Sequence, residues 1–241
     1  MSCHRKDYIT EVLEYGLIHP SNGLTNYFNV FFWCDYWIHI IYLDFKLIVM
    51  DISFENKRKP KRGRVLLSDP FSNDDYFKRS VVYLCEHHKD GSFGFVLNNY
   101  IDLDLFEISK NFPKIDTKIS IGGPVQTENI FFLHTLGADK IEGSLKIEDG
   151  IFLGGNYDQL VDLINAKKVS NKEVRFFLGY SGWSANQLQE ELDQHAWIVA
   201  PVLNPLEVMD FNVEKLWEKF MKREGKKFDL LSQFPVDLTL N

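Results

Sequence analysis

The chain has 241 residues, of which 45% are hydrophobic and 25% are charged. This composition supports a packed core and excludes a chain that is disordered throughout. The formal net charge of −7 disfavours binding to phosphate backbones through bulk charge, so any nucleic-acid contact requires a local basic patch. The length allows one large domain, or one domain with an appendage.

Residues 1–62 differ in character from the rest and are predicted to be an extension outside the folded domain. Residues 27–50 are apolar, but charged residues such as Asp35 interrupt them, and a central Asp costs about 2.5–3.5 kcal/mol in a membrane helix. The segment fits three interpretations: an extension upstream of a true start at Met50, an extra structural element, or a membrane contact. We favour the first. A single domain is expected over 63–241, without membrane association.

The eight residues at 57–64 include six Lys or Arg. A basic arm of this kind can bind RNA, DNA or an acidic partner. No aromatic residues are interleaved to stack on bases, so a solvated tail is favoured and nucleic-acid binding is the weaker hypothesis. The basic residues are Lys57, Arg58, Lys59, Lys61, Arg62 and Arg64.

The first part of the domain is predicted to be rich in β-structure. A strand over 63–68 ends at Asp69-Pro70, and two β-rich runs then flank the Lys-Asp-Gly sequence at 89–91, which is typical of a tight hairpin. Residues 101–108 have moderate helical or irregular character. Two further strands follow, separated by the Gly-Gly-Pro sequence at 122–124.

The cysteines Cys3, Cys34 and Cys85 are far apart and form no CxxC pair. Their spacing gives no support for structural zinc or a thioredoxin-like motif. Such usage is typical of the reducing cytoplasm, where we expect the protein to act. Cys85 lies in an apolar run and is predicted to be a plain buried thiol.

Two amphipathic helices are predicted in the second part of the domain. Asn156 is a good N-cap for the first, and Gln159 stands where it can complete a capping box. The second covers 213–225, with an apolar stripe along one face and Gly225 as its stop. A short turn and strand are expected just before the first helix. Strands and helices alternate irregularly, which favours an α+β fold.

The segment 175–201 is predicted to be a strand, a turn, a helix and a second strand. Gly179 and Gly182 permit a sharp turn with close backbone approach. Ser184 can cap the following helix, with Gln187 in the capping-box position.

Ser181 lies in a sequence that resembles the nucleophile elbow of hydrolases only in part. The elbow reads G-x-S-x-G, whereas Gly179 to Trp183 reads G-x-S-G-W, with the second glycine one place early. A helix that follows a glycine-rich turn could also bind an anion at its N-terminus, with Ser181 and Ser184 as extra donors. A joint built only for packing is the simplest interpretation.

The sequence contains no diagnostic metal or nucleotide motif. There is no HExxH, no GxGxxG and no GxxxxGK[ST]. Because His87 and His88 are adjacent on a predicted strand, they point to opposite faces and cannot easily share a metal ion. We expect no metal and no cofactor.

Three blocks of sequence, 63–99, 121–135 and 178–201, together resemble the bacterial YqgE/AlgH family, whose members have no established biochemical activity. The resemblance runs from about Gly63 to about Phe220. It implies an α+β fold with a branched, mostly antiparallel β-sheet curled into a pseudo-barrel and helices packed outside it. Some members of the family are linked to transcriptional regulation.

The positions that match the family pattern include polar residues on otherwise apolar strands. Such groups must find a partner or a ligand. An ion pair of Arg79 with a carboxylate such as Glu86 would be structural, but convergence near the 181–184 turn would form a polar pocket. The candidate pocket residues are Arg79, Glu86, Asn98, His134, Ser181 and Ser184.

A non-enzymatic cytoplasmic binding or regulatory protein is the favoured function, acting on a protein partner or a small anionic ligand. The alternatives are a hydrolase or transferase that uses Ser181 or His134, and nucleic-acid binding through 57–64. The sequence assigns no catalytic residue and no oligomeric state.

Overall fold

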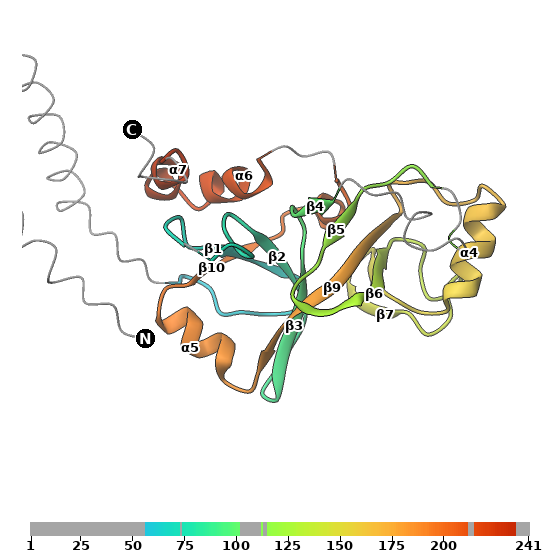
Figure 1. Ribbon diagram of the computed structural model, residues 1–241, viewed down its shortest axis with the longest axis horizontal. Helices are drawn as coiled ribbons and strands as arrows, with labels where there is room; N and C mark the ends of the chain where they lie inside the picture. Colours follow the sequence, from blue (N-terminus) through green and yellow to red (C-terminus); the bar gives the residue numbers. More distant parts are fainter. Residues whose placement is uncertain (1–55, 73, 102–111, 113–114, 212–214, 235–241) are drawn as a thin grey trace, which may run out of the picture. The chain divides into compact units, whose positions relative to one another are not determined.

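The computed structural model describes residues 56–72, 74–101, 112, 115–211 and 215–234. Most of the predicted N-terminal extension, residues 1–55, and the segment 102–108 lie outside the described residues. Within the described residues, ten strands form one branched sheet, and four α-helices and a 3-10 turn pack against it (Figure 1). The strands are β1 (Arg64–Ser68), β2 (Val81–His88), β3 (Gly91–Val96), β4 (Tyr100–Ile101), β5 (Ile119–Ile121), β6 (Val125–His134), β7 (Leu145–Glu148), β8 (Ile151–Leu153), β9 (Val174–Ser184) and β10 (Trp197–Pro201). The helices are α4 (Tyr157–Asn165), α5 (Gln187–Asp193), η1 (Pro205–Val208), α6 (Leu216–Arg223) and α7 (Lys226–Ser232).

The sheet runs in the order β10-β1-β2-β3-β9-β6-β8-β7, and all of these neighbours are antiparallel. The branch point is β9, because β5 also pairs with it, in parallel, and carries β4 along. The sheet curls into a half-barrel, so the predicted fold class is confirmed. The long strand β9 therefore belongs to both halves of the sheet.

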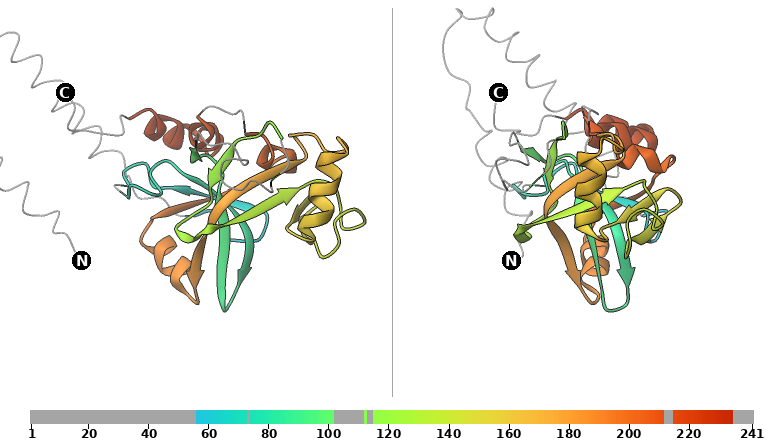
Figure 2. Two further views of the ribbon diagram at one scale, coloured as in Figure 1. Left: turned by 45° about the vertical axis from the view of Figure 1, so that its right-hand side comes forward. Right: turned by 90° about the vertical axis from the view of Figure 1, so that its right-hand side faces the viewer.

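Both faces of the strands β1, β2, β3 and β10 are covered by helices, and apolar side chains on each face pack against them. Side chains of a strand alternate between its two faces. Val65 and Tyr83 join the cluster under α6, whereas Leu66 and Leu84 join the cluster under α5. Figure 2 shows α6 and α7 on one side of these strands and α5 on the other.

The predicted C-terminal helix is confirmed as α6, and a further helix, α7, begins directly after Gly225. Burying each large apolar side chain of α6 contributes about 1.5–3 kcal/mol relative to an exposed position. Through this apolar stripe, α6 covers one face of the main core. Its buried members are Leu216, Trp217, Phe220 and Met221.

The helix α4 begins as predicted at Asn156, whose side-chain oxygen accepts a hydrogen bond from the backbone N–H of Gln159 at 3.2 Å. The second half of the predicted capping box is wrong, because the Gln159 side chain instead accepts from the N–H of Glu142 at 2.8 Å. The cap therefore also fastens α4 to the loop before β7. Leu160 and Ile164 bury the inner face of the helix.

The predicted hairpin of β2 and β3 is confirmed, with His88 opposite Gly91 across a two-residue loop. A β-bulge at Cys85 shifts the register, since Leu84 pairs with Gly94 and Glu86 with Phe93. Cys85 itself is fully buried and unpaired, and its burial raises the pKa of the thiol well above its usual value. The bulge decides which side chains of β2 face the candidate site.

Candidate functional site

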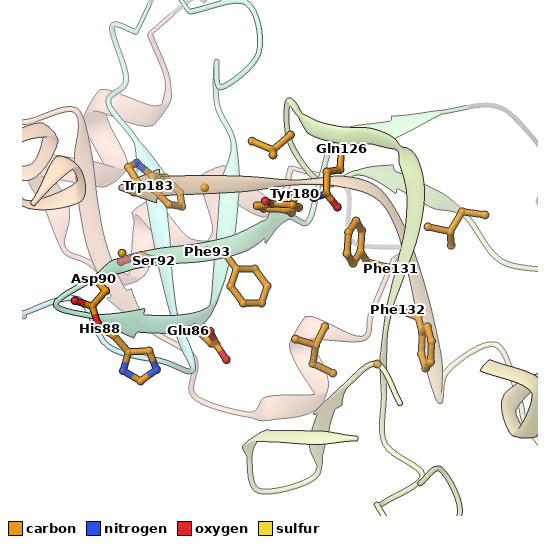
Figure 3. A pocket seen from close by; sticks show the side chains of 16 residues that line it. Glu86, His88, Asp90, Ser92, Phe93, Gln126, Phe131, Phe132, Tyr180 and Trp183 are labelled. Carbon is orange, nitrogen blue, oxygen red and sulfur yellow. The ribbon is translucent and has the colours of Figure 1, made fainter. Parts of the chain in front are cut away.

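A cavity of about 880 Å³, which we call the β3–β9 groove, lies between the two halves of the sheet. Side chains from the β2–β3 hairpin form one wall, and side chains from β6 and β8 form the other (Figure 3). The strand β9 joins the two walls. The lining residues are Glu86, His88, Asp90, Gly91, Ser92, Phe93, Val125, Gln126, Ile130, Phe131, Phe132, Leu153, Gly154, Tyr180, Gly182 and Trp183.

One row of cross-strand neighbours defines the hairpin wall of the groove. Glu86 on β2 pairs with Phe93 on β3, which pairs in turn with Gly182 on β9. Directly opposed residues project from the same face of a sheet, so the three positions face the groove together. Without the bulge, Glu86 would project from the opposite face, because one residue of register exchanges the two faces.

Gly182 keeps the groove open beside Phe93. A Cβ atom at this position would lie 3.1 Å from Cε2 of Tyr180 and 3.9 Å from Cγ2 of Val125. The missing side chain therefore leaves open the space over Gly182, beside the rings of Phe93 and Tyr180. Any larger residue would occupy this space.

Half-buried aromatic rings form the floor of the groove. The ring of Tyr180 lies 5.8 Å from that of Phe93 and 5.6 Å from that of Phe131, both in edge-to-face arrangements. One side of these rings packs on the main core, and the other lines the groove. The floor is therefore rigid and apolar, with exposed ring surface available to a ligand.

The rim of the groove is acidic. The described lining residues include two carboxylates, Glu86 and Asp90, and no Lys or Arg. His87 on the adjacent position of β2 hydrogen-bonds Ser92 through Nδ1 at 2.7 Å, and burial, followed by the charge of His88, lowers its pKa. The hairpin end thus presents negative charge to the groove.

The predicted sharp turn at Gly179–Ser184 is wrong, because β9 continues through Ser184. The close backbone approach is confirmed, since a Cβ on Gly179 would lie 2.7 Å from the carbonyl oxygens of both Gly123 and Val125. Gly179 has a φ of +64°, and the partner strand β6 loses register between Val125 and Ile130. The glycines therefore kink one strand instead of ending it.

Ser181 is buried within β9, and its hydroxyl donates to the carbonyl of Gly122 at 3.0 Å. It lines a second cavity, of about 310 Å³, on the α5 side of the strand. Ser184 is exposed, and its backbone N–H and hydroxyl both contact Oε1 of Gln187, at 3.0 and 3.1 Å. Ser184 is not the N-cap of α5, because the helix begins at Gln187 after Asn186.

The second cavity contains a carboxylate that sequence reasoning missed. Oε2 of Glu191 accepts hydrogen bonds from the indole N–H of Trp183 at 2.8 Å and of Trp197 at 2.7 Å. Its other oxygen, Oε1, accepts a hydrogen bond from Nε2 of Gln187 at 3.0 Å. The carboxylate is therefore occupied in fastening α5 to β9 and β10.

Arg79 and Asn98 come together, but away from both cavities. Nδ2 of Asn98 donates to the carbonyl of Arg79 at 2.8 Å, and its Oδ1 accepts from the N–H of Val81 at 2.8 Å. The guanidinium of Arg79 lies 3.5 Å from the carboxylate of Glu218 and 5.2 Å from the ring centre of Trp217. The ion pair of Arg79 is thus made with α6 and not with Glu86.

His134 is buried behind the wall formed by β6 and β8. Its Nδ1 accepts from the N–H of Leu136, so the proton sits on Nε2, which lies 3.0 Å from both the carbonyl of Gly154 and the hydroxyl of Ser144. Burial lowers its pKa, and the hydrogen bond to Gly154 opposes part of this shift. This neutral imidazole joins β6 to the loop after β8.

Of the six predicted pocket residues, the structure places Glu86 in the β3–β9 groove and Ser181 in the second cavity. The aromatic residues Phe93, Phe131 and Tyr180 were not singled out. Their alternation on strands indicated burial, and only the bulge and the register of β9 show that one side of each ring faces a cavity.

The basic segment contacts the domain at several points. Arg58 pairs with Glu224 at 2.6 Å, and Arg64 donates to the carbonyl of Lys59 at 2.5 Å. Asn56 bonds to the outer edge of β10, donating to Trp197 and accepting from Val199 at 2.9 and 2.7 Å. A hollow of about 400 Å³ is lined by Lys61, Arg62, Arg64 and Glu148 among others.

Two kinds of feature are absent from the part of the chain that the structure describes: a metal-binding cluster and a membrane-spanning helix. There, no three His, Cys, Asp or Glu side chains gather closely enough to hold a metal ion. None of the helices described for this chain combines the length and the apolarity needed to cross a bilayer.

The fold and the site define a small α+β half-barrel with an open, aromatic groove. A family model described as AlgH-like matches residues 65–229. The chain therefore belongs to the AlgH-like family. Similar proteins include UPF0301 proteins of Cytophaga hutchinsonii, 36% identical over 75% of this chain and 98% of that protein, and of Bacteroides fragilis, 37% identical over 77% and 94%.

Two solved structures share the fold. The solution structure of the AlgH protein from Pseudomonas aeruginosa is 28% identical, with a TM-score of 0.59, and the match covers 75% of this chain and 98% of that one. The crystal structure of protein DIP2367 from Corynebacterium diphtheriae is 24% identical, with a TM-score of 0.63 over 75% and 95% of the two chains. The resemblance of this chain to the family is thus confirmed.

Proposed function

We propose that the protein is a non-enzymatic binding protein and that the β3–β9 groove is its ligand site. The observation that carries this proposal is the cavity of about 880 Å³ with half-buried aromatic rings on its floor. Ligand sites are concave, mostly apolar and of about 300–1,000 Å³, with a few polar groups that orient the ligand. Glu86, His88 and Asp90 are such groups at the rim.

An enzymatic role has less support from the same geometry. A nucleophilic serine needs a base within hydrogen-bond reach of its hydroxyl. The single hydroxyl proton of Ser181 is donated to the carbonyl of Gly122, and the Nδ1 and Nε2 atoms of His134 are both engaged with its own surroundings. These contacts favour structural roles for both residues.

We further propose a cytoplasmic and regulatory role, in which occupancy of the groove is passed on to a protein partner. The thiol of Cys85, which forms no disulfide, is typical of a reducing compartment such as the cytoplasm, and the regulatory part rests on the family resemblance alone. A link to transcriptional regulation would act through that partner. Direct nucleic-acid binding through the basic segment is the less favoured route, because Arg58 and Arg64 already make internal contacts.

A thermal-shift screen of the full chain tests the groove as a ligand site. The panel contains organic cations, neutral aromatic compounds, phosphorylated metabolites, and short RNA and DNA. A ligand at about 100 times its dissociation constant should add about 2.7 kcal/mol to the free energy of unfolding.

A variant that fills the groove supplies the control for this screen. In Gly182→Val the added side chain occupies the space beside Phe93 and Tyr180, so the shift produced by a groove ligand should disappear. Leu203→Val, at a surface position that does not line the groove and where the side chain is 69% exposed, should keep it. A ligand that stabilises both variants equally binds elsewhere and contradicts the proposal.

A further inference from the structure

We infer that the β3–β9 groove selects a small organic cation, in which an ammonium or related group is carried on an apolar body. This inference rests on the proposed function and specifies the ligand class of the same site. It replaces the small anionic ligand that the sequence favoured. The aromatic floor, the charge of the rim and the dimensions of the cavity all favour this class of ligand.

The aromatic floor offers ring faces to a positive charge. Tyr180 stands edge-to-face with both Phe93 and Phe131, at interplanar angles of 75° and 83°. Rings arranged in this way surround a space with π surfaces that differ in direction, as in the aromatic cages that bind quaternary ammonium groups. Figure 3 shows Phe93, Tyr180 and Phe131 around the same opening, with Glu86 at its edge.

The rim adds charge of the opposite sign to the cation. Glu86 is the direct cross-strand neighbour of Phe93, so its carboxylate belongs to the same face as the aromatic floor. Asp90 lies at the end of the same hairpin. No Lys or Arg is among the described residues that line the groove, so an anion would meet repulsion from the two carboxylates with no Lys or Arg to offset it.

The cavity has room for more than the charged group alone. The remaining lining includes Ile130, Phe132 and Leu153 on the opposite wall, which offers apolar surface. Burying such surface stabilises an aliphatic or aromatic body by about 25 cal/mol per Å². The groove is therefore suited to a small molecule with one cationic end and one apolar end.

Three probes of the same size separate charge from shape. They are para-hydroxyphenyl trimethylammonium, its neutral isostere para-tert-butylphenol, and the anion para-hydroxybenzenesulfonate. Each is titrated into the full chain, and the amide chemical shifts of Phe93, Phe131 and Gly182 are followed by NMR. We expect the cation to bind roughly tenfold more tightly than the isostere, and the anion to cause no shift at these amides.

Glu86→Gln removes the charge at the rim and keeps the shape of the side chain. It should weaken binding of the cation by about fivefold and leave the affinity for the neutral isostere unchanged. Glu190→Gln, on the exposed face of α5, is the matched control and should alter neither. Tyr180→Leu should reduce binding of the cation more than that of the isostere, because it removes a ring and keeps apolar volume.

The outcomes distinguish this inference from the proposed function. If the cation and its isostere bind with equal affinity at the groove amides, the groove is a ligand site but the selectivity for cations is wrong. The same conclusion follows if Glu86→Gln weakens both probes alike. If none of the three probes shifts the groove amides while the thermal screen yields a ligand that Gly182→Val abolishes, only the cation inference is overturned. If that screen also fails, both proposals are wrong.

Discussion

Glu191 accepts hydrogen bonds from two buried tryptophans, and its removal leaves both indole N–H groups without their acceptor. Trp183 and Trp197 are only 6% and 4% exposed, so water cannot readily replace the carboxylate. Leaving a buried donor unsatisfied costs about 1–3 kcal/mol. The side chain therefore contributes more to stability than its position on a surface helix suggests.

We expect Glu191→Ala to lower the free energy of unfolding by about 2–3 kcal/mol. Urea denaturation followed by tryptophan fluorescence measures this change, and the emission of the native state should shift as well. Glu190→Ala, one residue away and exposed, should change stability by no more than about 0.5 kcal/mol. Equal effects of the two substitutions would show that the indole contacts carry no net stability.

His134 should make stability depend on pH below its ordinary pKa of 6.5. Because burial lowers the pKa in the folded state, the unfolded chain takes up the proton first. The contribution is therefore complete above pH 6.5 and is lost as the pH falls toward the folded pKa. NMR of the imidazole should show that it takes up its proton below pH 6.5, and His134→Gln should flatten the fall of the unfolding free energy below that pH. A ring that titrates at its ordinary pKa would contradict this.

At the residue scale, local signals in the sequence predicted single contacts well. Asn156 caps α4 because its side chain needs only a neighbouring N–H, and Gln187 reaches Ser184 for the same reason. Contacts between distant segments left no such signal. Glu191 meets Trp183 and Trp197 only because α5 folds back on two strands.

The kink in β9 is the element on which the branched sheet depends. Gly179 combines a φ of +64° with carbonyl oxygens 2.7 Å from a built Cβ, whereas Gly154 has a φ of +59° and no atom within 4 Å. Substituting each of these two glycines therefore separates the free-energy cost of a left-handed backbone from that of a steric clash.

Gly154→Ala should lower the free energy of unfolding by about 1–2 kcal/mol, the cost of the left-handed conformation alone. Gly179→Ala should cost about 3 kcal/mol or more, because the methyl group also displaces the backbone of Gly123 and Val125. Thermal and urea unfolding measure both. Similar losses in the two variants would mean that the sheet adjusts freely around β9.

At the element scale, alternation and turn residues predicted the β2–β3 hairpin, and the amphipathic stripe predicted α6. They failed at the bulge of Cys85 and at the kink of Gly179. Both are interruptions inside one strand. No turn residue marks the bulge within the hairpin, and the kink of Gly179 is set by contacts with the distant residues Gly123 and Val125. The β3–β9 groove depends on these two features, which is why it could not be predicted.

Arg175 connects distant parts of the molecule through a fully buried guanidinium. It donates to the carbonyls of Leu97 at the end of β3 and of Val208 in η1, and to the hydroxyl of Tyr100 at 3.1 Å. Burial lowers its pKa, while Tyr100 and the charge of Asp210 oppose the shift. The planar guanidinium donates hydrogen bonds to several acceptors at once in a fixed geometry that a lysine ammonium group cannot reproduce.

Arg175→Lys should therefore lower the free energy of unfolding by about 2–4 kcal/mol, because it leaves buried carbonyls without donors. Arg223→Lys is the control, since that side chain pairs with Glu207 at the surface and should matter by less than about 1 kcal/mol. Urea unfolding of both variants tests this. A cost for Arg175→Lys no larger than that of the control would contradict the connecting role.

At the scale of the whole molecule, the resemblance to a family predicted the half-barrel, and composition predicted a packed core. The arrangement of the polar candidates could not follow from either. Arg79, Asn98 and His134 all find polar partners within the fold, so a polar residue on an apolar strand can mark a structural contact as readily as a site.

The position of β9 in the chain has a consequence for synthesis. Its partners β3, β5 and β6 all precede it, and they pair with it but not with one another in the order of the sheet. A nascent chain that has emerged only as far as Asn171 therefore holds open strand edges on both halves of the future sheet. Open edges of this kind invite pairing with other chains. We expect the ribosome-bound chain to depend on chaperones at least until Ser184 has emerged, and the strands made before that point to remain sensitive to protease.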